Sequence, residues 1–333
     1  MQYRSVKGFT GWGQLGILLV FLGLGFILAG FAQLVIGYKV VPDGVPMESL
    51  GEAMIEALLQ PENVAYARLS QVLGTFFMMF IPSLLFSLTV HGRNKFWLGF
   101  NRHLNAKQVW VGFFIIIAAN FFAVPFEELT RSIVSNFPSL AEIADKLELQ
   151  YEQQMLALSN LGSWPEFLMA LAIMAFFPAL FEELFFRGAM QNLFARWWKR
   201  PYLAIIVTSL VFSFIHLSVY LFISRAILGF VLGLMYHKTR NIWVNIIAHF
   251  LNNAVALAQL FWLSTSGEDL TLENMEPEIP WWTSLIFFAI LFGLFKLLNR
   301  FSAVSRYTVE AEEIALYSKE GSDPFKHQDG IKH

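Results

Sequence analysis

Eight apolar stretches, most of them roughly the 20 residues that a membrane-crossing helix needs, dominate this chain of 333 residues. Lipid-exposed backbone must satisfy its own hydrogen bonds, so each stretch has to be a helix or be sheltered by helices. We therefore predict an all-α polytopic membrane protein with eight transmembrane helices. The stretches cover residues 12–36, 69–90, 109–125, 165–186, 202–217, 219–236, 242–263 and 281–298.

The composition agrees with a membrane protein and argues against several soluble classes. Hydrophobic residues make up 56% of the chain and charged residues only 14%, whereas soluble domains carry about 25% charged residues. A cytosolic enzyme, a disordered regulator and a nucleic-acid binder are therefore not expected. The chain has no Cys, which excludes thiol nucleophiles, disulfides and Cys-ligated metals.

The distribution of charge predicts the orientation. Most of the 23 Lys and Arg residues fall on the segments that lie inside when the N-terminus is inside, as the positive-inside rule requires. The loop 264–280 carries only acidic charges and falls outside. Both termini are then cytoplasmic. The two long outer loops, 38–68 and 126–164, contain the amphipathic runs Met47–Leu59 and Leu140–Leu158, which we predict as short helices.

Ionisable side chains inside a membrane span are costly, so they are functional candidates by default. The fourth stretch contains Glu182, Glu183 and Arg187. Glu183 and Arg187 are four residues apart and can pair on one helix face. Glu182 lies about 100° away around the helix and has no such partner. One interpretation is an ion-paired cluster that only holds helices together, although two adjacent acids are more charge than packing requires.

Two histidines in later stretches are candidates to meet Glu182. Glu182 and His216 are equally far along the chain from Lys199, in the inner turn of a helical hairpin, so helical rise puts them at one depth. His249 and Asn253 are four residues apart on another span, and we expect them to face the same level. Alone, His216 would more often be a satisfied core histidine, and the His249 stripe an interhelical hydrogen-bond seam.

This set of residues suits peptide hydrolysis by activated water. A carboxylate and an imidazole can hold a water molecule and act as general base, and a second His with an Asn can donate hydrogen bonds to an oxyanion. No Ser or Thr has an evident base partner, so an acyl-enzyme route is not expected. The alternative is a divalent metal such as zinc bound by Glu182, His216 and His249, and the sequence leaves that choice open.

The three motifs resemble, in order, those of the CPBP family, the intramembrane proteases that include type II CAAX prenyl endopeptidases and Abi proteins. They are Glu182-Glu183-x-x-x-Arg187, Phe212-x-x-x-His216 and His249-x-x-x-Asn253. The resemblance implies an eight-helix membrane endopeptidase in which Glu182 is the general base and His216 its partner on the water. It also implies that His249 and Asn253 stabilise the oxyanion, and that Glu183 and Arg187 support the site.

With this resemblance the chain divides into five segments. They are a three-span region with its outer loop (1–125), a partly helical outer loop (126–164), a CPBP-like catalytic core (165–263), the acidic loop with the last span (264–298) and a cytosolic tail (299–333).

The expected partners are the lipid bilayer and a peptide or membrane-anchored protein substrate, with no nucleic acid. The expected location is a bacterial plasma membrane, which the protein would cross several times. A non-catalytic protein that gives immunity to a bacteriocin or scaffolds a partner is the alternative function, and a proton-coupled transporter is a third.

Overall fold

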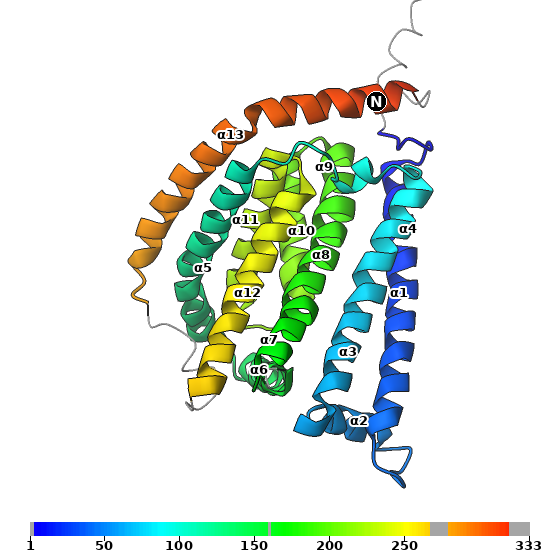
Figure 1. Cartoon of the computed structure of the whole chain (residues 1–333), viewed down its shortest axis with the longest axis vertical. Helices are drawn as coiled ribbons and strands as arrows, with labels where there is room; N and C mark the ends of the chain where they lie inside the picture. Colours follow the sequence, from blue (N-terminus) through cyan, green and yellow to red (C-terminus); the bar gives the residue numbers. More distant parts are fainter. Residues whose placement is uncertain (1–2, 159–160, 267–278, 320–333) are drawn as a thin grey trace, which may run out of the picture.

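The computed structural model describes residues 3–158, 161–266 and 279–319, and within them helices form and no β-strand does. Figure 1 shows the long helices standing side by side as one bundle. The α-helices are α1 (Gly11–Val40), α2 (Leu50–Leu58), α3 (Val64–Thr75), α4 (Ile81–Val90), α5 (Ala106–Val134), α6 (Pro138–Leu158), α7 (Trp164–Ala170), α8 (Phe177–Glu183), α9 (Asn192–Trp198), α10 (Pro201–Phe214), α11 (Phe222–Thr239), α12 (Ile242–Ser266) and α13 (Thr283–Lys319).

Six helical rods in the described part of the chain are long and apolar enough to cross a membrane. The two remaining predicted spans, 202–217 and 219–236, fall on the shorter helices α10 and α11, so the structure supports the all-helical membrane fold and leaves the count of eight as a prediction. The six rods cover Gly11–Val40, Pro61–Val90, Ala106–Val134, Trp164–Trp198, Ile242–Ser266 and Thr283–Ser318.

The two outer amphipathic runs form helices, as predicted. The first corresponds to α2, and the second to α6, which lies across the end of the bundle opposite to α9 (Figure 1). Residues 267–278, which carry most of the acidic loop, lie outside the described residues.

The fourth rod changes its helical winding twice around Pro178. The segments Leu171–Phe176 and Leu184–Gln191 are π-helical, and α8 lies between them with Pro178 in its first turn. Proline has no N–H to donate, so a regular helix cannot continue unchanged through it. π-Helical turns inside α-helices are frequent at functional sites. Here they flank Glu182 and Glu183.

The last helix continues far beyond the predicted span. Helix α13 runs on through Lys319 and bends across the end of the bundle where α9 ends (Figure 1). Glu313 anchors it there by ion pairs with Arg196, at 2.9 Å, and with Arg240. The part of the tail that the structure describes is therefore a helix packed on the bundle, and residues 320–333 lie outside the described residues.

Candidate active site

A fully buried carboxylate, Glu183, lies at the centre of the predicted site. Its side chain is 0% exposed, and its oxygens accept hydrogen bonds from Arg187 Nη1 at 2.8 Å, His249 Nδ1 at 2.9 Å and Asn245 Nδ2 at 3.1 Å. Asn245 also donates to the carbonyl of Leu232 at 2.7 Å. This network joins three helical elements, because its members come from α8 and the π-helical segment after it, from α12 and from α11.

The Arg187 side chain is held from a second side by the backbone of α11. Its side chain is 1% exposed, and Nη2 donates to the carbonyl of Gly229 at 3.2 Å. A Cβ atom at Gly229 would lie 3.1 Å from the ring of Phe212 and 3.2 Å from the Cα of Ser209. These separations are tighter than ordinary van der Waals contact, so glycine at this position eases the close approach of α10 and α11 beside Arg187.

Glu182 and His249 face one another across the interface of α8 and α12. The Oε2 atom of Glu182 lies 3.9 Å from Nε2 of His249, and both residues are buried. A separation of 3.9 Å is too long for a direct hydrogen bond, so Glu182 is less tightly held than Glu183. Because the Nδ1–H of His249 is directed to Glu183, the imidazole presents Nε2 toward Glu182.

His216 lies in the loop that follows α10, and it belongs to the same electrostatic cluster. The charges of Glu182 and His249 both act on its imidazole. Its Nδ1 lies 2.6 Å from the carbonyl oxygen of Phe212. A carbonyl only accepts, so Nδ1 carries the proton and Nε2 has its lone pair available in the neutral ring. Glu182, His216 and His249 therefore interact electrostatically, and their catalytic roles stay a prediction.

Asn253 lies one helical turn beyond His249 and is half-buried. Its Oδ1 accepts a long hydrogen bond from Asn252 Nδ2 at 3.5 Å, which leaves the Asn253 amide N–H groups available as donors. Asn252 in turn accepts from the side chain of Asn120 on α5. Of the predicted stripe on α12, Asn245 and His249 both contact Glu183, and the role of Asn253 stays a prediction.

Helix α6 covers the loop that holds His216. Glu148 accepts from Ser218 Oγ at 3.0 Å, and Asp145 accepts from Tyr220 Oη at 2.6 Å. Arg225 donates to the backbone carbonyl of His216 at 3.3 Å. Irregular backbone at membrane depth requires shelter by protein, and α6 provides that shelter next to the candidate site.

The geometry also tests whether the set suits a metal. In the parts of the chain that are described, no group of three or more His, Asp or Glu side chains is arranged so that it could hold a metal ion. The Nδ1 atoms of His216 and His249 are both engaged within the protein. The metal shell of Glu182, His216 and His249 therefore has no preformed geometry here, and metal binding stays a prediction.

Sequence reasoning missed two features of this site. The first is the bond between Glu183 and His249, because the spacing of residues pairs Glu183 only with Arg187. The second is Asn120, a lone amide in an otherwise apolar stretch. The rule that singles out polar side chains inside a membrane span would have found Asn120.

Comparison with known proteins agrees with the motifs. Residues 164–255 match the family described as type II CAAX prenyl endopeptidase Rce1-like. A relative from Bacillus subtilis (strain 168), the uncharacterized protein YpbD, is 34% identical over 108 residues, which are 31% of this chain and 52% of the relative. The chain thus spans about half the length of the curated relative it matches. No solved structure matches the chain.

The matched segment overlaps most of the predicted core 165–263, and it contains Glu182, Glu183, His216, His249 and Asn253. The long apolar rods identify an integral membrane protein. Segment 164–255 is thus similar to the type II CAAX prenyl endopeptidases, and this match supports the resemblance to the CPBP family of intramembrane proteases.

Proposed function

We propose that this protein is an intramembrane endopeptidase that hydrolyses a peptide bond with an activated water molecule. The observation that carries this proposal is the approach of Glu182 to His249 Nε2, at 3.9 Å, beside a His249 ring that Glu183 fixes at 2.9 Å. A buried carboxylate without a hydrogen bond among the described residues, facing an oriented imidazole, costs stability. A catalytic role of Glu182 explains why this destabilising arrangement is present.

In this mechanism Glu182 and His216 bind the water molecule between them. Glu182 takes one proton from the water, and the resulting hydroxide oxygen bonds to the carbonyl carbon of the substrate peptide. The neutral His216 ring accepts a hydrogen bond from the same water through Nε2, because its Nδ1–H is used on the Phe212 carbonyl. The C–N bond then breaks as the proton is returned to the departing amine nitrogen.

His249 and Asn253 stabilise the negative oxygen that forms on the attacked carbonyl. Because Nδ1–H of His249 donates to Glu183, His249 can donate to the oxyanion only from Nε2, in a ring that carries a proton on both nitrogens. The free amide N–H of Asn253 supplies the second donor. Such donors are most effective away from bulk water, and His249 is buried at 8% exposure.

Glu183 and Arg187 act as positioning residues. Glu183 fixes the tautomer and the ring orientation of His249, in the manner of a carboxylate that orients a catalytic imidazole. Arg187 neutralises that carboxylate at 2.8 Å. If a divalent metal were bound instead, Glu182, His216 and His249 would be its ligands and it would supply an activated water.

One observation favours the alternative of a non-catalytic protein that provides immunity or a scaffold. The oxygens of Glu183 accept hydrogen bonds from Arg187, Asn245 and His249, so this part of the cluster is explained by holding the helices together. A purely structural cluster does not explain Glu182, which makes no hydrogen bond within it among the described residues.

The test uses the full chain in vesicles with two probes. One is a farnesylated peptide that ends in the Cys-a-a-X motif, and the other is a set of single-span membrane peptides. We expect cleavage by the wild type, and a loss of about 10²–10⁴-fold in Glu182→Gln or His216→Ala without loss of folded protein. Equal cleavage by Glu182→Gln would contradict the roles, and no cleavage by the wild type would favour the non-catalytic alternative.

The substrate that we infer is a membrane-anchored protein segment. The candidate residues lie within the helical bundle, so a peptide that is already in the membrane reaches them without crossing the bilayer. We infer a bacterial plasma membrane as the location, because the predicted inner loops between the spans are short and carry most of the basic residues.

A further inference from the structure

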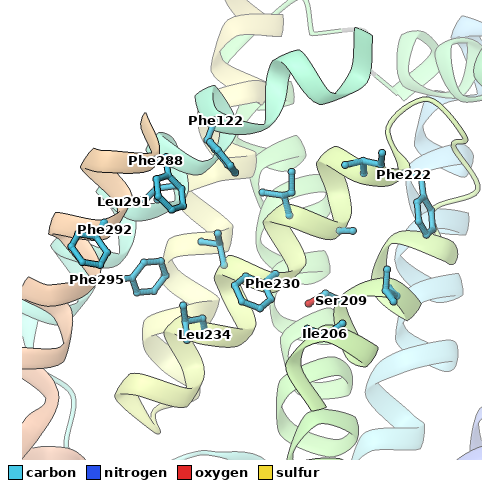
Figure 2. Close-up of a pocket in the computed structure, with 15 residues that line it drawn as sticks. Phe122, Ile206, Ser209, Phe222, Phe230, Leu234, Phe288, Leu291, Phe292 and Phe295 are labelled. Carbon is cyan, nitrogen blue, oxygen red and sulfur yellow. The ribbon is translucent and has the colours of Figure 1, made fainter. Parts of the chain in front are cut away.

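An apolar groove lies on the flank of the bundle between α10, α11 and α13. Its volume is about 510 Å³, which is within the range of ligand-binding pockets. Figure 2 shows Phe288, Phe292 and Phe295 of α13 on one side, with Phe230 and Leu234 of α11 and Ile206 of α10 on the other. None of the residues that line the groove belongs to the Glu182 cluster, so the groove is separate from the candidate active site.

The groove offers a ligand no free hydrogen-bonding group. Apart from Ser209, its side chains are apolar, and the Ser209 hydroxyl already donates to the carbonyl of Ile205 at 2.7 Å. A hydrocarbon chain is the matching ligand. An unfilled groove of this kind would lose dispersion contacts along its whole lining, and the surrounding medium of a membrane protein consists of acyl chains.

One end of the groove has a basic rim. On α13, the Lys296 ammonium lies 4.4 Å from the ring centroid of Phe292, which lines the groove. On α11, Lys238 follows the lining residue Leu234 by one helical turn and so lies on the same face. Two of the elements that form the groove thus each carry a lysine at its border.

The surroundings of His237, next to Lys238, carry the same sign of charge. The charged groups that act on its ring are Arg240, Lys238 and Arg306, and all three are cationic. The nearby acid Glu313 is already paired with Arg240. The side-chain charges that act on His237 at this end of the groove are therefore all positive.

We propose that the groove binds one anionic glycerophospholipid, with an acyl chain along α11 and the phosphate at Lys238 and Lys296. The apolar lining fits an acyl chain, and the basic rim fits an anionic headgroup. Basic residues beside membrane helices attract anionic lipids by about 1 kcal/mol each. This proposal does not depend on proteolysis, so it stands or falls separately from the function proposed above.

The bound lipid would also stabilise the contact between α10 and α11 next to the candidate active site. Phe230 lines the groove, and the preceding residue, Gly229, accepts the hydrogen bond from Arg187. A Cβ atom at Gly229 would lie 3.2 Å from the Cα of Ser209, so α10 and α11 are close together at this point. A chain packed against Phe230 and Ser209 holds these two helices together, so the lipid stabilises the folded protein.

The test measures lipid retained by the purified full-length protein in detergent, by native mass spectrometry. Phosphatidylglycerol and phosphatidylcholine with identical acyl chains are the two probes. We expect phosphatidylglycerol to bind more tightly and to raise the melting temperature more. Lys238→Gln and Lys296→Gln should each weaken phosphatidylglycerol binding by about fivefold and leave phosphatidylcholine unchanged.

Two matched controls locate the effect. Ala226→Trp fills the groove, because Ala226 lines it, and should abolish retention of both lipids. Two control variants lie on α1, away from the groove. They are Leu19→Trp, at an exposed position, and Lys39→Gln, in the last turn of the helix, and they should leave the retention of both lipids unchanged. A phosphatidylglycerol with a photoreactive acyl chain should label α11 and α13 of the unmodified protein, which needs no variant to fold.

Three results would overturn the proposal. They are equal retention of the two lipids by the wild type, undiminished retention by a folded Ala226→Trp protein, and labelling confined to helices outside the groove. A dimer of the wild type that Ala226→Trp disrupts would assign the groove to a second copy of the chain instead.

Discussion

Alanine in place of Glu183 would leave the Arg187 guanidinium without its counter-ion in the protein interior. The two side chains are 0% and 1% exposed and their charged atoms lie 2.8 Å apart. Removing one partner of a buried ion pair costs about 3–5 kcal/mol, because the remaining charge stays desolvated. His249 loses its Nδ1 acceptor as well. We therefore predict that Glu183→Ala lowers the free energy of unfolding by about 3–5 kcal/mol.

Two further variants separate the charge from the packing. The double variant Glu183→Leu/Arg187→Met removes both charges and keeps most of the volume, so it should recover much of the lost stability. Glu142→Ala breaks the exposed pair of Glu142 with Lys146 at 3.1 Å and should cost at most about 1 kcal/mol.

Equilibrium unfolding in mixed micelles measures these differences, and vesicle cleavage assays on the same proteins separate support from catalysis. The double variant should be folded but poorly active, because the His249 ring is no longer oriented. The reasoning is refuted if Glu183→Ala costs no more than Glu142→Ala, or if the double variant is less stable than the single one.

Two further predictions concern the ends of the bundle. Burial raises the pKa of Glu313, but the guanidinium groups of Arg196 and Arg240 more than offset this and hold it below the usual 4.5. The ionised carboxylate therefore stabilises the fold fully above pH 4.5, and this stabilisation is lost as the pH falls through the lower folded pKa. Glu313→Gln should lower the free energy of unfolding by about 1.5–3 kcal/mol at pH 7 and by little in acid. Melting curves recorded at a series of pH values measure this difference. Tyr220→Phe removes the 2.6 Å hydrogen bond to Asp145 and should speed amide hydrogen exchange in α6. Unchanged exchange would contradict the role of this hydrogen bond in holding α6 over the loop.

The positions of the chemical groups could be predicted from the sequence, but their pairing could not. Helical spacing puts Glu183 beside Arg187, and it puts Asn245, His249 and Asn253 on one stripe of α12. Which carboxylate that stripe meets depends on the rotation of α12 against α8, and no spacing within one helix encodes that rotation. The result is that Glu183, rather than Glu182, accepts from both Asn245 and His249.

The ends of helices α10 and α13 were also outside the reach of sequence patterns. Helix α10 has 14 residues and so spans about 21 Å. It ends at Phe214, although neither Gly nor Pro marks a stop there. In α13, Ser302, Val309 and Tyr317 form a buried stripe beyond the apolar span. Charged neighbours hide this stripe, and only the bundle end that it covers explains it.

The account rests on Glu182 as the group that activates water for peptide cleavage. The most direct measurement is cleavage of the vesicle-bound peptides in ¹⁸O-labelled water, with the mass of the new carboxyl terminus determined for the wild type and for Glu182→Gln. We expect one ¹⁸O atom in the wild-type product, and about 10²–10⁴-fold less product from the folded variant. Undiminished, ¹⁸O-labelled product from Glu182→Gln would contradict it.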